Sequence, residues 1–413
     1  MKEKRRNLKG LVISLTFTLC LLLAVDLLYA EIISQELPRR EGWKAGEIIF
    51  HSALKTAVQF DSNIYLSANG EKDDIITIIN PSFGLKMPLR DNELSLEYDV
   101  AINEFGRFTE NNYIDHRIQA DAEIKLTDYK ISITDLYNRL TDRAGTEDVN
   151  RTRRQTNVFR TGISTERNRL RFDLSYMNLL EQFLTTDIFF STWTYKDKSN
   201  MTHLIDLESS YRFRPKTALV WENAVGYVDY YKNDAIFPNS YYLESLLGIK
   251  GEWYSKITTD VRAGARFQEY KSSSLANDEN YCNLEARGTL DYTFTPEDAL
   301  NLRLVKTIYP STYQDMNYYA INMMGVNYSH KFYKVLASLF GSIQYNTYPK
   351  DSTEGGIVDK RKDWLYSSGC SWKYDIRKWV SVEAKYEYLK RDSRFSNLDY
   401  TEHLTTLTGT VGF

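Results

Sequence analysis

The sequence contains little cysteine and little proline: of its 413 residues, 3 are cysteine and 8 are proline. Cys20 falls in an apolar run near the N-terminus, which leaves Cys282 and Cys370 far apart in the remaining chain. Two distant cysteines argue against a disulfide framework, and neither has metal-ligand spacing to another cysteine or histidine.

Long apolar runs are also scarce. A helical membrane protein needs repeated runs of about 18 or more apolar residues, whereas this chain has one such run and a mean hydropathy of −0.47. The net charge of −3 gives no case for nucleic-acid binding.

The apolar run belongs to an N-terminal export signal. Five basic residues lie between positions 2 and 9, the apolar stretch Leu11–Val25 follows, and Ala30 occupies the candidate cleavage point. This order predicts a secretory signal peptide over residues 1–30. The alternatives are an uncleaved membrane anchor or a lipoprotein modified at Cys20, where Leu19 replaces the small residue such a site wants. Residues 31–46 are short and polar, and we expect a periplasmic tail there.

The chain is rich in aromatic residues, with 31 tyrosines, and in strand-like alternation. In 93–103, apolar side chains such as Leu94, Leu96 and Tyr98 alternate with charged ones such as Glu97 and Asp99. The same pattern recurs in 114–126, 169–176 and 379–388. A charged residue at nearly every second position needs water on one face of each strand, and the other face needs a continuous apolar partner.

The turns between these strands follow a regular rhythm. Tight polar turns are predicted near 90–92, 127–128, 167–168, 214–215, 254–255, 295–298, 332–333 and 376–378. Longer connections are predicted near 67–73, 105–112, 141–151, 181–199, 232–239, 272–279, 310–316, 347–361 and 391–399. Short turns that alternate with longer loops predict roughly eighteen strands, with short periplasmic turns and longer extracellular loops. A β-propeller is the alternative, but its blades hold four short strands each.

The C-terminal stretch Tyr400–Phe413 also alternates, with Leu407, Val411 and Phe413 on its more apolar face. It resembles the membrane-insertion signal of outer-membrane barrels, a final amphipathic strand that ends in phenylalanine. We expect this strand to close the barrel by pairing with the first strand, near residues 47–59.

Catalytic motifs are missing from the sequence. It has no G-x-S-x-G, no H-E-x-x-H, no Gly-rich phosphate loop and no C-x-x-C-H haem site, and its five histidines fall on five different predicted strands. We therefore predict no enzyme activity, no catalytic residue, no metal and no cofactor.

The candidate functional residues are arginines expected on the lumen side. Arginine presents a planar fork that suits carboxylate or phosphate. Four of the candidates, near the outer mouth, are Arg151, Arg153, Arg154 and Arg160, and four on lumen faces are Arg117, Arg171, Arg262 and Arg266. These arginines alternate with carboxylates, so the competing interpretation is a ladder of ion pairs along a wet wall. The apolar connection 181–199 is predicted either to fold inward as a constriction or to extend beyond the membrane as a hairpin.

Four segments resemble a known family. They are F-D-S-N-I-Y (60–65), D-D-I-I-T-I-I-N-P-S-F-G-L (73–85), L-S-L-E-Y-D-V (94–100) and N-N-Y-I-D-H-R (111–117). Together they resemble the putative β-barrel porin 2 family of Gram-negative outer-membrane proteins. The resemblance implies a signal-peptide-bearing barrel, often associated with exopolysaccharide systems, and supplies no catalytic residues.

The sequence therefore predicts an all-β, transmembrane, antiparallel up-and-down barrel over residues 47–413, located in the outer membrane. The expected function is a pore for exopolysaccharide export through a polar, charged lumen. The alternatives are a general diffusion porin for small solutes and a non-conducting barrel that sheathes a partner protein. The expected partners are outer-membrane lipid, the barrel-assembly machinery, a polysaccharide and periplasmic export proteins, and no nucleic acid.

Overall fold

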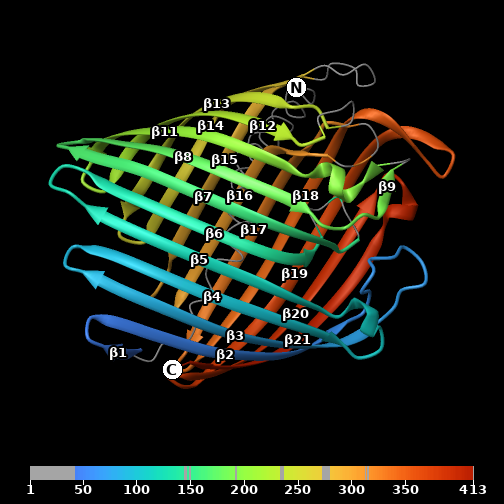
Figure 1. Ribbon diagram of the computed structural model, residues 1–413, viewed down its shortest axis with the longest axis horizontal. Coiled ribbons are helices and arrows are strands. Elements are labelled where there is room, and N and C mark those ends of the chain that lie inside the picture. The colour runs from blue at the N-terminus through green and yellow to red at the C-terminus, as the bar shows by residue number, and fades with distance from the viewer. Residues whose placement is uncertain are drawn as a thin grey trace, which may run out of the picture.

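The computed structural model describes residues 42–143, 147, 150–190, 193–232, 237–271, 280–311, 313 and 316–412. The predicted signal peptide (1–30), most of the predicted tail and Phe413 lie outside these residues. One antiparallel sheet closes on itself and forms a barrel (Figure 1). No helix in the described ranges is long and apolar enough to cross a membrane.

Eighteen long strands of the described chain form the barrel wall. They are β2 (Ile48–Asp61), β3 (Asp74–Leu89), β4 (Asn92–Phe105), β5 (Tyr113–Lys125), β6 (Lys130–Asp142), β7 (Thr152–Arg167), β8 (Leu170–Phe183), β11 (Asn200–Arg214), β12 (Thr217–Tyr230), β13 (Ser240–Tyr254), β14 (Ile257–Tyr270), β15 (Tyr281–Thr293), β16 (Asp298–Pro310), β17 (Tyr318–Phe332), β18 (Val335–Glu354), β19 (Ile357–Arg377), β20 (Val380–Ser393) and β21 (Tyr400–Gly412). The short elements are β1 (Trp43–Ala45), β9 (Ile188–Phe190), β10 (Trp193–Thr194) and the 3-10 turns η1 (Thr109–Asn111), η2 (Tyr195–Lys198) and η3 (Ser396–Leu398).

Strand β21 closes the barrel against β2, as the sequence predicted. Val58 lies opposite Leu407, and Ala53 lies opposite Gly412. Consecutive strands pair around the rest of the wall, so the described sheet has no unpaired long edge. Closure satisfies the backbone hydrogen-bonding groups that an open sheet would expose to lipid.

All eight predicted tight turns join consecutive strands at one end of the barrel, on the left in Figure 1. Arg90, Asn168 and Tyr333 adopt positive φ angles of 56°, 59° and 54° in three of these turns. The opposite end carries the longer connections.

One connection differs from the prediction. Residues 347–361 were predicted as a long loop, but β18 continues to Glu354 and β19 begins at Ile357. The two strands form a long hairpin around Gly355 and Gly356, whose φ angles are +57° and +81°. Consecutive glycines provide the left-handed conformation that a two-residue hairpin turn requires.

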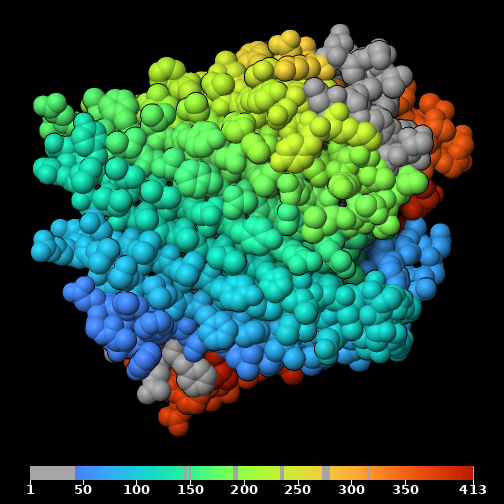
Figure 2. Space-filling model, in the orientation of Figure 1, coloured from blue at the N-terminus to red at the C-terminus, as the bar shows by residue number. Residues whose placement is uncertain are grey.

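Side chains alternate between an apolar outer surface and a polar lumen. On β2, Leu54, Val58 and Phe60 are exposed on the outside, while Lys55 and Gln59 occupy the alternate positions. On β13, Leu243 and Leu247 are 49% and 66% exposed. This inverted pattern, with large apolar side chains facing outward along the strands, fits a surrounding hydrocarbon layer. The near wall, made of β3 to β8, forms a continuous surface (Figure 2).

Candidate functional site

The lumen wall of strands β11 to β15 carries a network of arginines and carboxylates. Arg262 on β14 lies 2.7 Å from Glu208 and 2.7 Å from Asp260, and it also bonds Glu222. Arg287 on β15 contacts the same Glu222 and approaches Glu244 at 3.5 Å. The alternation of the strands places these groups on one face, so each charge has opposite charges within reach.

At the outer mouth, two arginines converge on one backbone carbonyl. Arg143 Nη2 and Arg151 Nη1 donate to the carbonyl oxygen of Ile64 at 3.0 and 3.1 Å. Arg151 also lies 3.7 Å from Asp61, and Arg143 lies 4.0 Å from Glu402. Burial lowers the pKa of Arg143, and the adjacent charge of Arg151 acts in the same direction. The two nearby carboxylates compensate this repulsion.

These arginines belong to the β6–β7 connection, whereas their partners lie at the seam of β2 and β21. Strands β3, β4 and β5 separate β2 from β6 in the wall. Asn63 anchors the receiving loop, because its side-chain amide donates to the carbonyls of Ser67 and Thr401 at 3.0 Å each. Arg143 and Arg151, at the two ends of the β6–β7 connection, therefore bond a fixed segment of the mouth.

Glu147 of the same connection contacts the far side of the barrel. Its carboxylate accepts a hydrogen bond of 2.6 Å from Ser311 Oγ, in the β16–β17 connection, and its backbone oxygen accepts one of 3.3 Å from Arg391 on β20. Strand β16 lies about half-way around the wall from β6. Glu147 of the β6–β7 connection thus contacts residues on the opposite side of the mouth.

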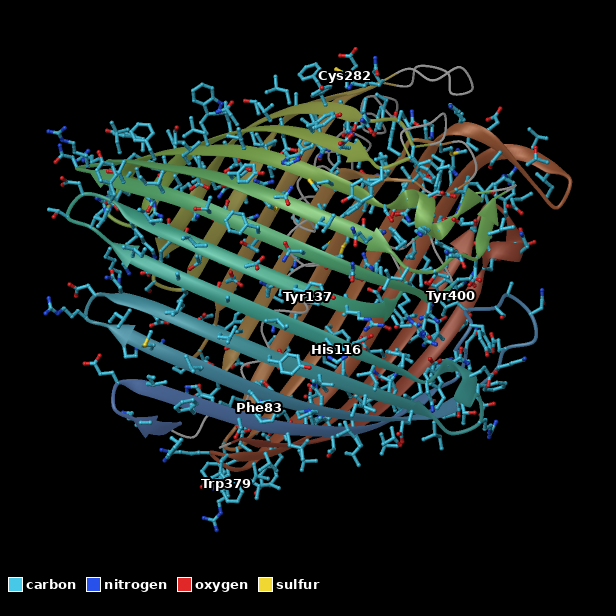
Figure 3. The ribbon with its side chains drawn as sticks, viewed as in Figure 1. Phe83, His116, Tyr137, Cys282, Trp379 and Tyr400 are labelled. Atoms are coloured by element: carbon cyan, nitrogen blue, oxygen red, sulfur yellow. The ribbon has the colours of Figure 1, made fainter. Side chains whose placement is uncertain are left out.

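Aromatic rings pack against two buried arginines near Glu147, Arg361 and Arg391. Arg361 is 1% exposed and lies over the rings of Tyr313 and Tyr348, at 4.5 and 4.7 Å, while its guanidinium bonds Asp363 at 2.7 Å. Arg391 is equally buried and lies 4.8 Å from the ring of Tyr400. Figure 3 shows Tyr400 at the loop end of the barrel. Packing of this kind fills one side of the mouth.

The chain matches the family Putative beta-barrel porin 2 over residues 39–413. It belongs to this family. The match covers the whole barrel and extends beyond the four segments that carry the sequence resemblance. No curated protein sequence matches the chain.

Solved outer-membrane porins share the fold of this porin at very low sequence identity. OccK2 (OpdF) from Pseudomonas aeruginosa is 8% identical with a TM-score of 0.50, covering 88% of this chain and 98% of that one. A BenF-like porin from Pseudomonas fluorescens Pf-5 is 10% identical with a TM-score of 0.49, covering 89% of this chain and 99% of that one. OpdK from P. aeruginosa is 10% identical with a TM-score of 0.47, covering 88% and 99%. This likeness shows the barrel fold alone, and the assignment to the porin family rests on the family match over residues 39–413.

The structure separates the eight predicted arginines of this porin by their surroundings. Arg154 bonds Asp142 and Glu181, Arg117 bonds Asp99, and Arg171 bonds Asp173. Arg262 belongs to the network above, and Arg266 lies 3.8 Å from Glu244 and 4.1 Å from the ring of Tyr242. Arg151 donates to the carbonyl of Ile64 and lies 3.7 Å from Asp61 at the mouth. These six form ion pairs within the wall or the mouth.

The other two arginines lie on opposite faces of β7. Arg160 pairs in register with Thr134, whose hydroxyl bonds Asp121 in the lumen. Arg160 is exposed, and the one side-chain hydrogen bond that it donates among the described residues goes to Met177 Sδ at 3.5 Å. Arg153 alternates with the lumen-facing Arg154 and therefore points outward. The sequence predicted one basic cluster that contains both residues, but Arg153 points outward and Arg160 points into the lumen.

The connection 181–199 keeps its described contacts close to its own strands. Tyr195 stacks on Phe183 at 6.5 Å, the Ser199 hydroxyl accepts from the backbone of Phe183, and Asp197 pairs with Lys232 at 3.0 Å. Ile188 is 66% exposed. The described contacts across the mouth come instead from Glu147 of the β6–β7 connection, where no sequence pattern indicates a constriction.

Proposed function

We propose that this porin is a diffusion channel for small polar solutes, with an entrance narrowed by the β6–β7 connection. The observation that carries the proposal is that described residues of this connection bond both sides of the mouth. Arg143 and Arg151 bond the carbonyl of Ile64, and Glu147 accepts hydrogen bonds from Ser311 and Arg391. A polar lumen behind a narrowed mouth filters solutes by size and charge.

An exopolysaccharide passage is less well supported by this geometry. A polymer must thread the whole channel, and the connection across the mouth would have to leave its anchors first. The charged wall fits either substrate, so it does not separate them. We also infer a non-enzymatic role, a location reached through the N-terminal signal, and assembly by the machinery that inserts outer-membrane barrels.

Arg160 supports a preference for acidic solutes. Its guanidinium faces the lumen without a carboxylate partner in the described residues, whereas the paired lumen arginines are neutralised. An anionic solute can therefore approach Arg160 without displacing an ion pair.

Liposome swelling with sugars of increasing length tests the size filter. We expect rapid entry of mono- and disaccharides and a sharp loss of entry for longer oligosaccharides. Entry of long oligosaccharides at a similar rate would contradict the small-solute channel and favour polysaccharide passage. A correctly inserted barrel that admits no solute at all would favour the sheath.

A further inference from the structure

The outer surface of β6 to β8 carries polar side chains where lipid is expected. On β6, buried Leu136 and Asn138 point inward, so Asp135, Tyr137 and Arg139 point outward. Both charged residues of this series are exposed. Their neighbours on β7 and β8 include three side-chain amides. We name the six residues Asp135, Tyr137, Arg139, Gln155, Asn157 and Gln182 the polar face.

The register brings these residues together. Arg139 lies opposite Gln155, which lies opposite Gln182 on β8, and Tyr137 lies opposite Asn157. Asn157 donates to Asp135 at 2.7 Å, and the Tyr137 hydroxyl donates to Gln155 at 3.3 Å. The polar face is therefore one connected patch across three strands.

The patch reaches deep along the wall. From the short-turn end of β6, the first two outward-facing residues are Ile131 and Ile133. The third outward-facing residue is Asp135. On β14, across the barrel, the first six outward residues from Ile257 to Phe267 are uncharged, and the first charge is Glu269. Figure 3 shows Tyr137 about midway along the near wall, with His116 beside it. Hydrocarbon covers this depth in an outer-membrane barrel.

Hydrocarbon is a poor partner for these groups. A charged side chain on the lipid face destabilises a barrel by an amount that grows with its depth in the bilayer. Arg139 forms no ion pair within the described ranges, and the hydrogen bond that Asp135 accepts comes from a neutral amide. Protein contact would provide the charge partners and hydrogen bonds that lipid cannot.

We propose that the polar face packs against a second copy of this chain. Copies in one membrane share their orientation, so residues of equal depth meet, and a two-fold contact between them is self-complementary. Side-chain amides and the tyrosine hydroxyl both donate and accept hydrogen bonds, so this patch can pair with itself. The charges also balance, with one acid and one base. Acidic lipid headgroups attract clusters of basic residues, and this patch has no basic excess.

Site-directed crosslinking in the outer membrane tests the proposal. Asn157→Cys is placed in the full chain with Cys282→Ser and Cys370→Ser, and a short thiol crosslinker is added to intact membranes. The matched control is Ala263→Cys in the same background, because Ala263 lies mid-strand on the outward face of β14. We expect a dimer-sized or larger adduct of this chain from Asn157→Cys and its absence from Ala263→Cys.

Several outcomes would overturn the second copy as the occupant: no adduct at position 157, equal adducts at both positions, or an adduct whose mass identifies lipopolysaccharide or another protein. Heat-modifiable migration on a gel confirms that each variant is folded. As a second measurement, Asp135→Leu with Arg139→Leu should shift the detergent-extracted porin toward the monomer while single-channel conductance stays unchanged. An unchanged oligomer distribution would contradict the proposal, and the unchanged conductance keeps this test independent of the pore function.

Discussion

At the level of single residues, the described wall contains arginines that carboxylates neutralise and arginines that form no ion pair. Arg262 illustrates the first kind, with contacts to Glu208, Glu222 and Asp260. Arg160 illustrates the second, since it forms no ion pair among the described residues. An ion pair in the wall presents little net charge to a passing solute, whereas an isolated guanidinium presents a full one.

Replacing Arg160 with glutamine should therefore reduce the preference of the channel for anions. The expected result is a shift of the reversal potential toward cation selectivity, measured on single channels under a salt gradient. Arg153→Gln is the matched control, because Arg153 lies on the same strand but points outward, and it should leave the reversal potential unchanged. Equal shifts for both variants, or none for Arg160→Gln, would remove the assigned role of Arg160.

The sequence identified the lumen arginines as a class but could not sort them. Alternation along β4 and β5 places Asp99 and Arg117 on one face, so their ion pair follows from the pattern. On β6 the pattern reverses in the outer half, where Leu136 points inward while Asp135 and Arg139 point outward. Hydropathy alone assigns these faces wrongly, which is why the polar face was not predicted.

At the level of elements, the central contact is the pairing of β2 with β21. These strands are the most distant in the chain, yet they are neighbours in the wall. The sequence predicted this pairing because a barrel with an even number of strands needs its last strand beside its first. The strand pattern did not predict the long β18–β19 hairpin. This hairpin depends on a turn of two glycines inside a polar stretch that is typical of a loop.

Cysteines at Val58 and Leu407 should form a disulfide in the assembled barrel, because directly opposed residues of antiparallel strands lie within about 4.5–5.5 Å. The background carries Cys282→Ser and Cys370→Ser. Non-reducing gels after oxidation in the membrane should show a compact, faster-migrating chain. Val58→Cys with Val411→Cys is the control, four residues out of register, and it should not crosslink. The opposite ranking would mean that the register of the closure is shifted.

At the level of the whole molecule, the barrel combines a largely apolar outer surface, a lumen of paired charges and a mouth that contacts of Glu147 cross. The strand pattern predicts the first two, because they repeat on most strands. The crossing depends on single contacts between distant loops, such as Ser311 with Glu147, and no periodic feature of the sequence signals them. The apolar content of the connection 181–199 instead indicated a constriction there.

The most direct test of the account is the single-channel conductance of a variant that has lost its anchors across the mouth. Glu147→Ala with Arg391→Gln removes the hydrogen bonds that Glu147 accepts from Ser311 and Arg391, and the connection is then freer to leave the mouth. Lys390→Gln is the matched control, since Lys390 neighbours Arg391 on β20 but points outward. We expect higher conductance and a larger sugar cut-off for the double variant and wild-type values for Lys390→Gln. A correctly folded double variant with unchanged conductance would contradict the claim that the β6–β7 connection narrows this pore.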